Sequence, residues 1–248
     1  MGYREARLKV DRARKHIDEF EQSGASMIRP PSLKLEAVQS PTSTGLVDYV
    51  LRVLREPPED LPLILGDALH NLRAALDHLA IAVVEANGGN VNGVYFPFGL
   101  DAAHLDQQIG YKKFDRASAD AVSLLRTIAP RKDGNAELRA IHDLDIADKH
   151  KLILEVANNA GLPSLDLDFT TQTYFRLPEG IPSFSPVVDG TVLFSGPPEP
   201  GFRIGSAVQV YAVFEFGPGS PLAGAQISFK LRELADLVDQ TIAQFEAL

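Results

Sequence analysis

Two nine-residue segments hold most of the side chains that could do chemistry. The first, His70–His78, reads HNLRAALDH, and the second, His142–His150, reads HDLDIADKH. Both fit the pattern H-[ND]-L-x-x-A-x-x-H, and together they hold four of the six histidines. Imidazole and carboxylate groups can transfer protons near neutral pH or ligate metal ions. We therefore expect the function of the protein to reside in these two segments.

The first segment gathers its polar side chains on one broad side of a helix. Since an ideal helix turns about 100° per residue, Asn71 and His78 lie within roughly 40° of Asp67. On the same scale His70 lies at about −60° and Arg73 at about −120°. The opposite side carries an apolar stripe that predicts a buried face: Leu69, Leu72, Leu76, Leu79 and Val83. No Lys, Glu or Gln occurs between residues 67 and 78, which indicates a site in preference to a solvated surface.

The second segment is equally rich in titratable groups. His142, Asp145 and Lys149 follow an i, i+3, i+7 line, which places them near one side of a helix. His150 lies where the helical pattern gives way to the strand-like sequence LILEV. We expect one site that joins Asp67–His78 to this segment.

A divalent metal is one cofactor that the site could use. Two histidines eight residues apart on one helix, such as His70 and His78, are separated by about 12 Å and cannot share an ion. Asp67 with His70 and His142 with Asp145 could instead supply two ligands each. One pair from each helix would form a His/carboxylate site, as in a metal-dependent hydrolase or a metal-binding helical bundle.

Arg73-x-x-x-x-His78 resembles the R-x4–6-H motif of the HEPN superfamily, small helical bundles that include many bacterial toxins and defence ribonucleases. The resemblance covers one helix and implies metal-independent cleavage of RNA, with no cofactor required. It implies that His78 acts as the acid and base and that Arg73 stabilises the charged phosphate.

A second resemblance covers both segments. The sequences HNLRAALDHLA and LRAIHDLDIADKHKLIL are similar to paired motifs of a recurrent family of uncharacterised bacterial proteins. The similarity extends from about Gly66 to Leu154. It implies no particular activity, but it implies that both segments belong to one site.

A third possibility is a non-catalytic binding or assembly protein. In this alternative the polar side chains of two packed helices form a hydrogen-bonded layer that fixes their register. The expected partners across that layer are Asp67, Asn71 and Arg73 on one helix and Asp145, Asp148 and Lys149 on the other. A homodimer is compatible with this alternative.

Composition narrows the choice of partners and location. The net charge of −9 argues against broad binding to duplex DNA, which relies on basic surface, whereas local cations in a cleft could still act on RNA. The absence of cysteine excludes disulfides and cysteine-based zinc sites. No apolar run approaches the roughly 18–20 residues of a membrane span, and the charged start lacks the apolar region of a secretory signal. We expect a cytoplasmic protein that does not engage membranes.

The order of helix-like and strand-like segments around the site predicts an α+β fold, in which a helical bundle core packs with an antiparallel β-sheet. Strands are expected at Leu33–Val38 and Asp48–Val53, around a turn at 40–45, and in a β-rich segment at about 151–225. The stretch Gly24–Pro31 is predicted to break the first helix. One integrated domain over residues 1–248 is expected. The predicted helices cover about 3–22, 61–87, 101–108, 116–128, 135–149 and 226–247.

Overall fold

The structure is a computed structural model that describes residues 2–28, 33–42, 44–151, 156–161, 166–169, 174–176, 188–196, 202–204, 211–217 and 219–248. The described residues form six α-helices and eight short strands, which confirms the predicted α+β class. The chain divides into two compact units. The helical unit comprises Met1–Glu21, Asp60–Glu155 and Phe216–Leu248, and the strand unit comprises Gln22–Glu59 and Val156–Glu215. One integrated domain over residues 1–248 stays a prediction.

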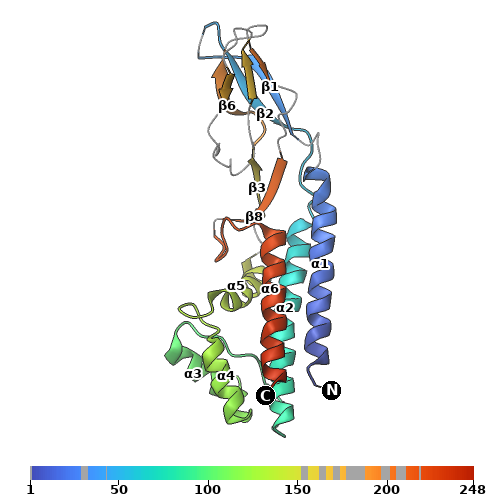
Figure 1. The fold of residues 1–248 in the computed structure, drawn as a ribbon, viewed down its shortest axis with the longest axis vertical. Coiled ribbons are helices and arrows are strands. Elements are labelled where there is room, and N and C mark those ends of the chain that lie inside the picture. The colour runs from blue at the N-terminus through green and yellow to red at the C-terminus, as the bar shows by residue number, and fades with distance from the viewer. Residues whose placement is uncertain are drawn as a thin grey trace. The chain divides into compact units, whose positions relative to one another are not determined.

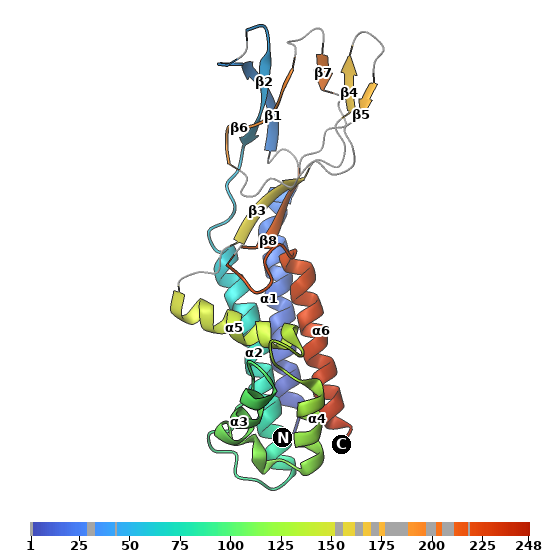
Figure 2. The same ribbon diagram turned by 90° about the vertical axis from the view of Figure 1, so that its left-hand side faces the viewer.

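The helical unit is organised around three helices that run side by side (Figures 1 and 2). These are α1 (Arg4–Ile28), of which the part up to Glu21 belongs to this unit, α2 (Leu61–Ala86) and α6 (Ile227–Glu246). The helix α5 packs against both α2 and α6. The remaining helices of the unit are α3 (Ala102–Tyr111), η1 (Phe114–Arg116), α4 (Ala119–Ile128) and α5 (Ala136–Lys151).

The long helix α2 follows the prediction closely. Pro62 occupies its first turn, where a missing N–H costs nothing. The helix ends at Ala86, Asn87 caps it, and Gly88 follows in the left-handed region with φ of +70°. The N–H of Gly88 donates to the carbonyl of Glu85 at 2.9 Å, a helix stop that favours glycine. The predicted apolar stripe is buried in full: Leu69, Leu72, Leu76, Leu79 and Val83.

The first helix is longer than the sequence predicted. A break was expected at Gly24–Pro31, but α1 continues through Gly24 to Ile28. A Cβ atom at Gly24 would lie 2.7 Å from the ring of Phe214. Glycine at this position therefore permits close packing against an aromatic ring, and this contact outweighs its low helix propensity.

The strand unit confirms the predicted hairpin. Strand β1 (Leu33–Gln39) pairs antiparallel with β2 (Val47–Val53), in a register that joins Leu33 to Val53 and Gln39 to Val47. A third strand, β6 (Thr191–Gly196), pairs with the other edge of β2. A second sheet has the order β5 (Tyr174–Arg176), β4 (Asp166–Phe169) and β7 (Phe202–Ile204). A third sheet pairs β3 (Val156–Gly161) with β8 (Tyr211–Phe216).

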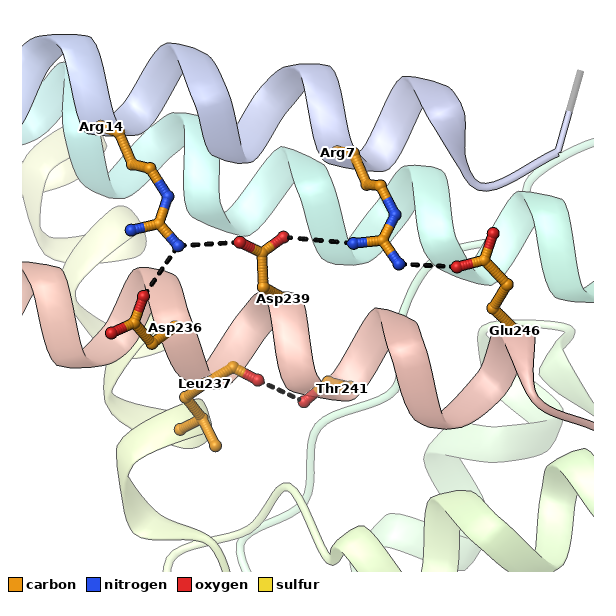
Figure 3. A network of polar contacts seen from close by, with 7 residues as sticks. All are labelled: Arg7, Arg14, Asp236, Leu237, Asp239, Thr241 and Glu246. Carbon is orange, nitrogen blue, oxygen red and sulfur yellow. Dashed lines mark hydrogen bonds and ion pairs between the residues drawn. The ribbon is translucent and has the colours of Figure 1, made fainter.

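Ion pairs join α1 to α6 along their exposed side (Figure 3). Arg14 Nη2 lies 2.8 Å from Asp236 Oδ1 and 2.8 Å from Asp239 Oδ2. Arg7 lies 3.7 Å from the other oxygen of Asp239 and 2.6 Å from Glu246. Asp239 is thus shared between two arginines, so the four pairs form a connected network.

Among the described residues, no helix is both long enough and apolar enough to cross a bilayer.

Candidate functional site

The two histidine-bearing segments lie against each other on α2 and α5. His70 Nδ1 lies 2.9 Å from Asp145 Oδ1, and Arg73 Nε donates to His142 Nδ1 at 3.3 Å. Residue numbers rise along α2 where they fall along α5 in these contacts, and α5 lies across α2 (Figures 1 and 2). We call these four residues the α2–α5 polar layer.

The layer continues one turn toward the start of α2. A Cβ atom at Gly66 would lie 2.6 Å from Asp148 Oδ1. Asp148 follows Asp145 by three residues, as Gly66 precedes His70 by four, so the contact continues the same opposed residue order along the two helices. The absence of a side chain at Gly66 lets the carboxylate of Asp148 approach the backbone of α2.

The His70–Asp145 pair combines a buried carboxylate with an accessible imidazole. The side chain of Asp145 is 7% exposed and that of His70 is 51% exposed. Because a carboxylate accepts, His70 Nδ1 donates in this pair. In the neutral imidazole, Nε2 then carries the lone pair and can take a proton. Asp145 therefore fixes the orientation of the His70 ring.

Arg73 is held inside the layer. Its guanidinium carbon lies 4.7 Å from the centroid of the Phe98 ring. Its Nη1 lies 2.6 Å from Asp77 Oδ1, an ion pair in which the N–H does not form a well-directed hydrogen bond. Asp77 Oδ1 also accepts from the backbone N–H of Phe96 at 2.9 Å. Arg73 is only 8% exposed, so in this arrangement it braces the layer and does not face solvent.

His142 contacts both Phe98 and Arg73. Its ring lies parallel to that of Phe98, with centroids 4.7 Å apart and an interplanar angle of 9°. Burial, followed by the positive charges of Arg73 and Arg139, lowers the pKa of His142 to about 4. The imidazole is therefore neutral near pH 7, which is what acceptance of a hydrogen bond from Arg73 requires.

The remaining candidates on α2 face other surroundings. Asp67 is exposed, and its carbonyl accepts from Asn71 Nδ2 at 2.8 Å. Lys9 Nζ lies 3.4 Å from Asn71 Oδ1, so buried Asn71 links α2 to α1. His78 is half-buried and makes no hydrogen bond to any residue that the structure describes. Arg73 contacts His142 and Asp77, and the structure does not join it to His78.

The remaining predicted site residues are Lys149, His150 and the four predicted metal ligands. Lys149 and His150 lie in the last turns of α5, and their side chains are outside the described residues. Within the described part of the chain, no three His, Asp or Glu side chains are grouped so as to hold a metal ion. The predicted ligands pair differently, since His70 meets Asp145 whereas His142 meets the cation Arg73.

Two residues of the site were not predicted. Phe98 stacks on His142 and contacts Arg73. Arg139 pairs with Asp143 at 2.7 Å and donates to the carbonyl of Gly99 at 3.0 Å. In the sequence, Phe98 could have been found from the extended Phe-Pro-Phe segment after α2. Arg139 could have been found from its i, i+4 spacing to Asp143 on α5.

Comparisons with known proteins add no assignment. The chain matches no family model, no curated protein and no solved structure. The function therefore rests on the site itself.

Proposed function

We propose that the protein is a metal-independent acid–base catalyst that cleaves RNA, with His70 as the proton-transfer group. The observation that carries this proposal is the His70–Asp145 pair. A buried carboxylate holds one nitrogen of a half-exposed imidazole at 2.9 Å. This arrangement leaves the other nitrogen able to exchange protons with a bound substrate.

The chemistry requires a base and an acid but no metal. The base removes the proton from a ribose 2′-hydroxyl, whose oxygen attacks the adjacent phosphorus. The P–O bond to the 5′-oxygen breaks, and that oxygen takes up a proton. His70 Nε2 can accept the first proton, while Asp145 stabilises the resulting imidazolium. The R-x4-H resemblance supports RNA as the substrate, although the geometry favours His70 over His78 as the base.

Incubation of pooled cellular RNA with the protein in excess EDTA tests this proposal. We expect cleavage by the unmodified chain, and a loss of about 10²-fold or more in His70→Gln, as for removal of a general base. Asp145→Asn should also be impaired, because the amide cannot stabilise the imidazolium. His78→Ala serves as the matched histidine control.

Three results would count against the proposal. Equal cleavage by the unmodified chain and by His70→Gln would overturn it. Loss of cleavage in His78→Ala alone would transfer the role to the residue of the HEPN-type motif. Loss of cleavage in EDTA, restored by a divalent metal, would favour the metal-dependent hydrolase.

A second candidate is a non-catalytic binding or assembly protein in which the polar layer is structural. The observation that favours it is Arg73, which is buried between Asp77, Phe98 and His142. In this case Arg73→Met should lower the free energy of unfolding by about 2–4 kcal/mol, since it breaks a buried ion pair. His70→Gln should then leave RNA integrity unchanged. An Arg73→Met protein as stable as the unmodified chain would contradict the structural role.

A further inference from the structure

Two exposed tyrosines flank a lysine at a surface outside the polar layer. Tyr95 is 49% exposed and Tyr111 is 75% exposed. Lys112 Nζ lies 5.6 Å from the centroid of the Tyr95 ring and 5.1 Å from that of Tyr111. The N–H of Tyr95 donates to the carbonyl of Lys112 at 3.2 Å, which holds the two chain segments together. We call these three residues the tyrosine–lysine patch.

The surroundings of the patch are locally basic. The sequence 111–116, YKKFDR, carries three cations and a single carboxylate, Asp115, in a chain of net charge −9. Lys113 Nζ lies 3.2 Å from the carbonyl of Asn92, and Arg116 Nη1 lies 2.6 Å from that of Asn90. These bonds go to neutral carbonyl groups, so the cations are not neutralised by them. The patch is a positive, aromatic surface on an acidic protein.

We propose that the tyrosine–lysine patch binds single-stranded RNA. Aromatic rings form platforms on which unpaired bases stack, and an adjacent cation neutralises the phosphate between them. The cation between the two rings favours an anionic strand over a neutral polysaccharide. The choice of RNA rests on the proposed function, whereas the stacking and charge arguments rest on the patch alone.

The chain connects the patch directly to the polar layer. Phe98 follows Tyr95 by three residues and stacks on His142, and Phe96 donates its N–H to Asp77. Three extended residues span at most roughly 10 Å. A strand held at Tyr95 therefore lies within the reach of a short oligonucleotide from the α2–α5 contact.

Fluorescence anisotropy with a labelled single-stranded 2′-O-methyl oligoribonucleotide tests the binding surface. This probe lacks the 2′-hydroxyl and cannot be cleaved by the proposed reaction, so affinity is measured apart from catalysis. Tyr111→Ser should weaken binding about fivefold or more, since stacking contributes roughly 1–3 kcal/mol per base. Lys112→Gln should make the plot of log affinity against log salt shallower by about 0.7.

The controls remove similar groups elsewhere. Phe229→Ala removes an aromatic side chain that is 61% exposed on α6. Lys132→Gln removes one exposed lysine between α4 and α5. Both controls should bind the probe as the unmodified chain does, and melting temperatures of all variants establish that they are folded.

The inference is overturned if the unmodified chain fails to bind the probe at low salt, or if Tyr111→Ser and Lys112→Gln bind it normally. Binding of a neutral oligosaccharide in place of the probe would also overturn it. Patch-dependent binding without any RNA cleavage would support the patch and refute the catalytic function. Cleavage that depends on His70 but not on Tyr111 or Lys112 would support the catalytic function and refute RNA binding by the patch.

Discussion

His142 is a histidine that folding keeps neutral. Burial contributes most to its lowered pKa, and the charges of Arg73 and Arg139 act in the same direction. Asp143 and Asp145 oppose the shift without cancelling it. The neutral ring can then accept from Arg73 and stack on Phe98 at the same time.

Stability should therefore fall at acidic pH because of this one side chain. The pKa of His142 is about 4 in the folded protein, against an ordinary value of 6.5. Between these values the unfolded chain binds more protons, so the stability that this histidine confers is complete above pH 6.5 and declines toward pH 4. Its full size is about 3 kcal/mol.

Urea unfolding of the unmodified chain and of His142→Phe, measured from pH 7.5 to 4.5, checks this prediction. The phenylalanine preserves an aromatic stack but cannot be protonated. The free energy of unfolding of the unmodified chain should fall by about 2–3 kcal/mol relative to that of His142→Phe as pH falls. A difference that stays constant across this range would contradict the prediction.

Gly66 should resist replacement although it lies within a helix. Alanine normally favours a helix over glycine by about 1 kcal/mol, but at Gly66 its Cβ would lie 2.6 Å from Asp148 Oδ1. We expect Gly66→Ala to lower the free energy of unfolding by about 1–3 kcal/mol. In the matched control Gly110→Ala, on α3, no atom lies within 4 Å of the new Cβ, and stability should not fall.

Chemical denaturation of both variants supplies the measurement. Combining Gly66→Ala with Asp148→Ala should recover part of the loss, because the obstructing carboxylate is gone. Equal stability of Gly66→Ala and Gly110→Ala would show that the contact does not constrain α2.

The sequence predicted the members of the polar layer better than their partners. Helix geometry placed His70 and Arg73 on the polar side of α2, and the i, i+3 spacing linked His142 to Asp145. It could not reveal that Arg73 meets His142, because the offset between two packed helices depends on tertiary packing. Five residues along a helix also turn it by about 140°, which explains why Arg73 and His78 do not share one contact.

Among the elements, α1 and α6 are joined by a network whose centre is Asp239. This carboxylate contacts both Arg7 and Arg14, whereas Asp236 contacts Arg14 alone within the network. Networks of exposed charges contribute more than isolated pairs, which are worth about 0–1 kcal/mol.

We expect Asp239→Asn to lower the free energy of unfolding by about 1 kcal/mol, and Asp236→Asn to lower it by less. The difference should diminish in 1 M salt, where screening extends over only about 3 Å. Thermal melts of both variants at low and high salt provide the test. Equal effects of the two substitutions would argue against a shared central carboxylate.

Element boundaries were predictable where local chemistry decides them. Asn87–Gly88 ends α2 as expected, and the hairpin around residues 40–45 has the expected strands. The end of α1 was predicted wrongly because Gly24 is a helix breaker by propensity alone. Its close packing against Phe214 is a tertiary contact that the local sequence does not encode.

At the scale of the whole molecule, each of the two compact units contains buried apolar residues of its own. Leu231 is fully buried in the helical unit, and Leu51 is fully buried in the strand unit. We expect Leu231→Ala and Leu51→Ala each to cost about 2–5 kcal/mol. Each should lower a different thermal transition.

Differential scanning calorimetry of the two variants and the unmodified chain resolves these transitions. A single transition that both substitutions lower equally would instead support the one integrated domain predicted from sequence. That prediction relied on the absence of a clear linker, and sequence alone does not show that the chain leaves the helical unit and later returns to it.

The order of segments in the helical unit has a consequence for biosynthesis. The partners of Arg7 and Arg14 lie on α6, which is made after all the other described helices. At typical translation rates α6 follows α1 by roughly 10–40 s. During this interval the side of α1 that contacts α6 in the folded protein lacks its partner helix. The three-helix bundle can therefore close only after α6 has been synthesised.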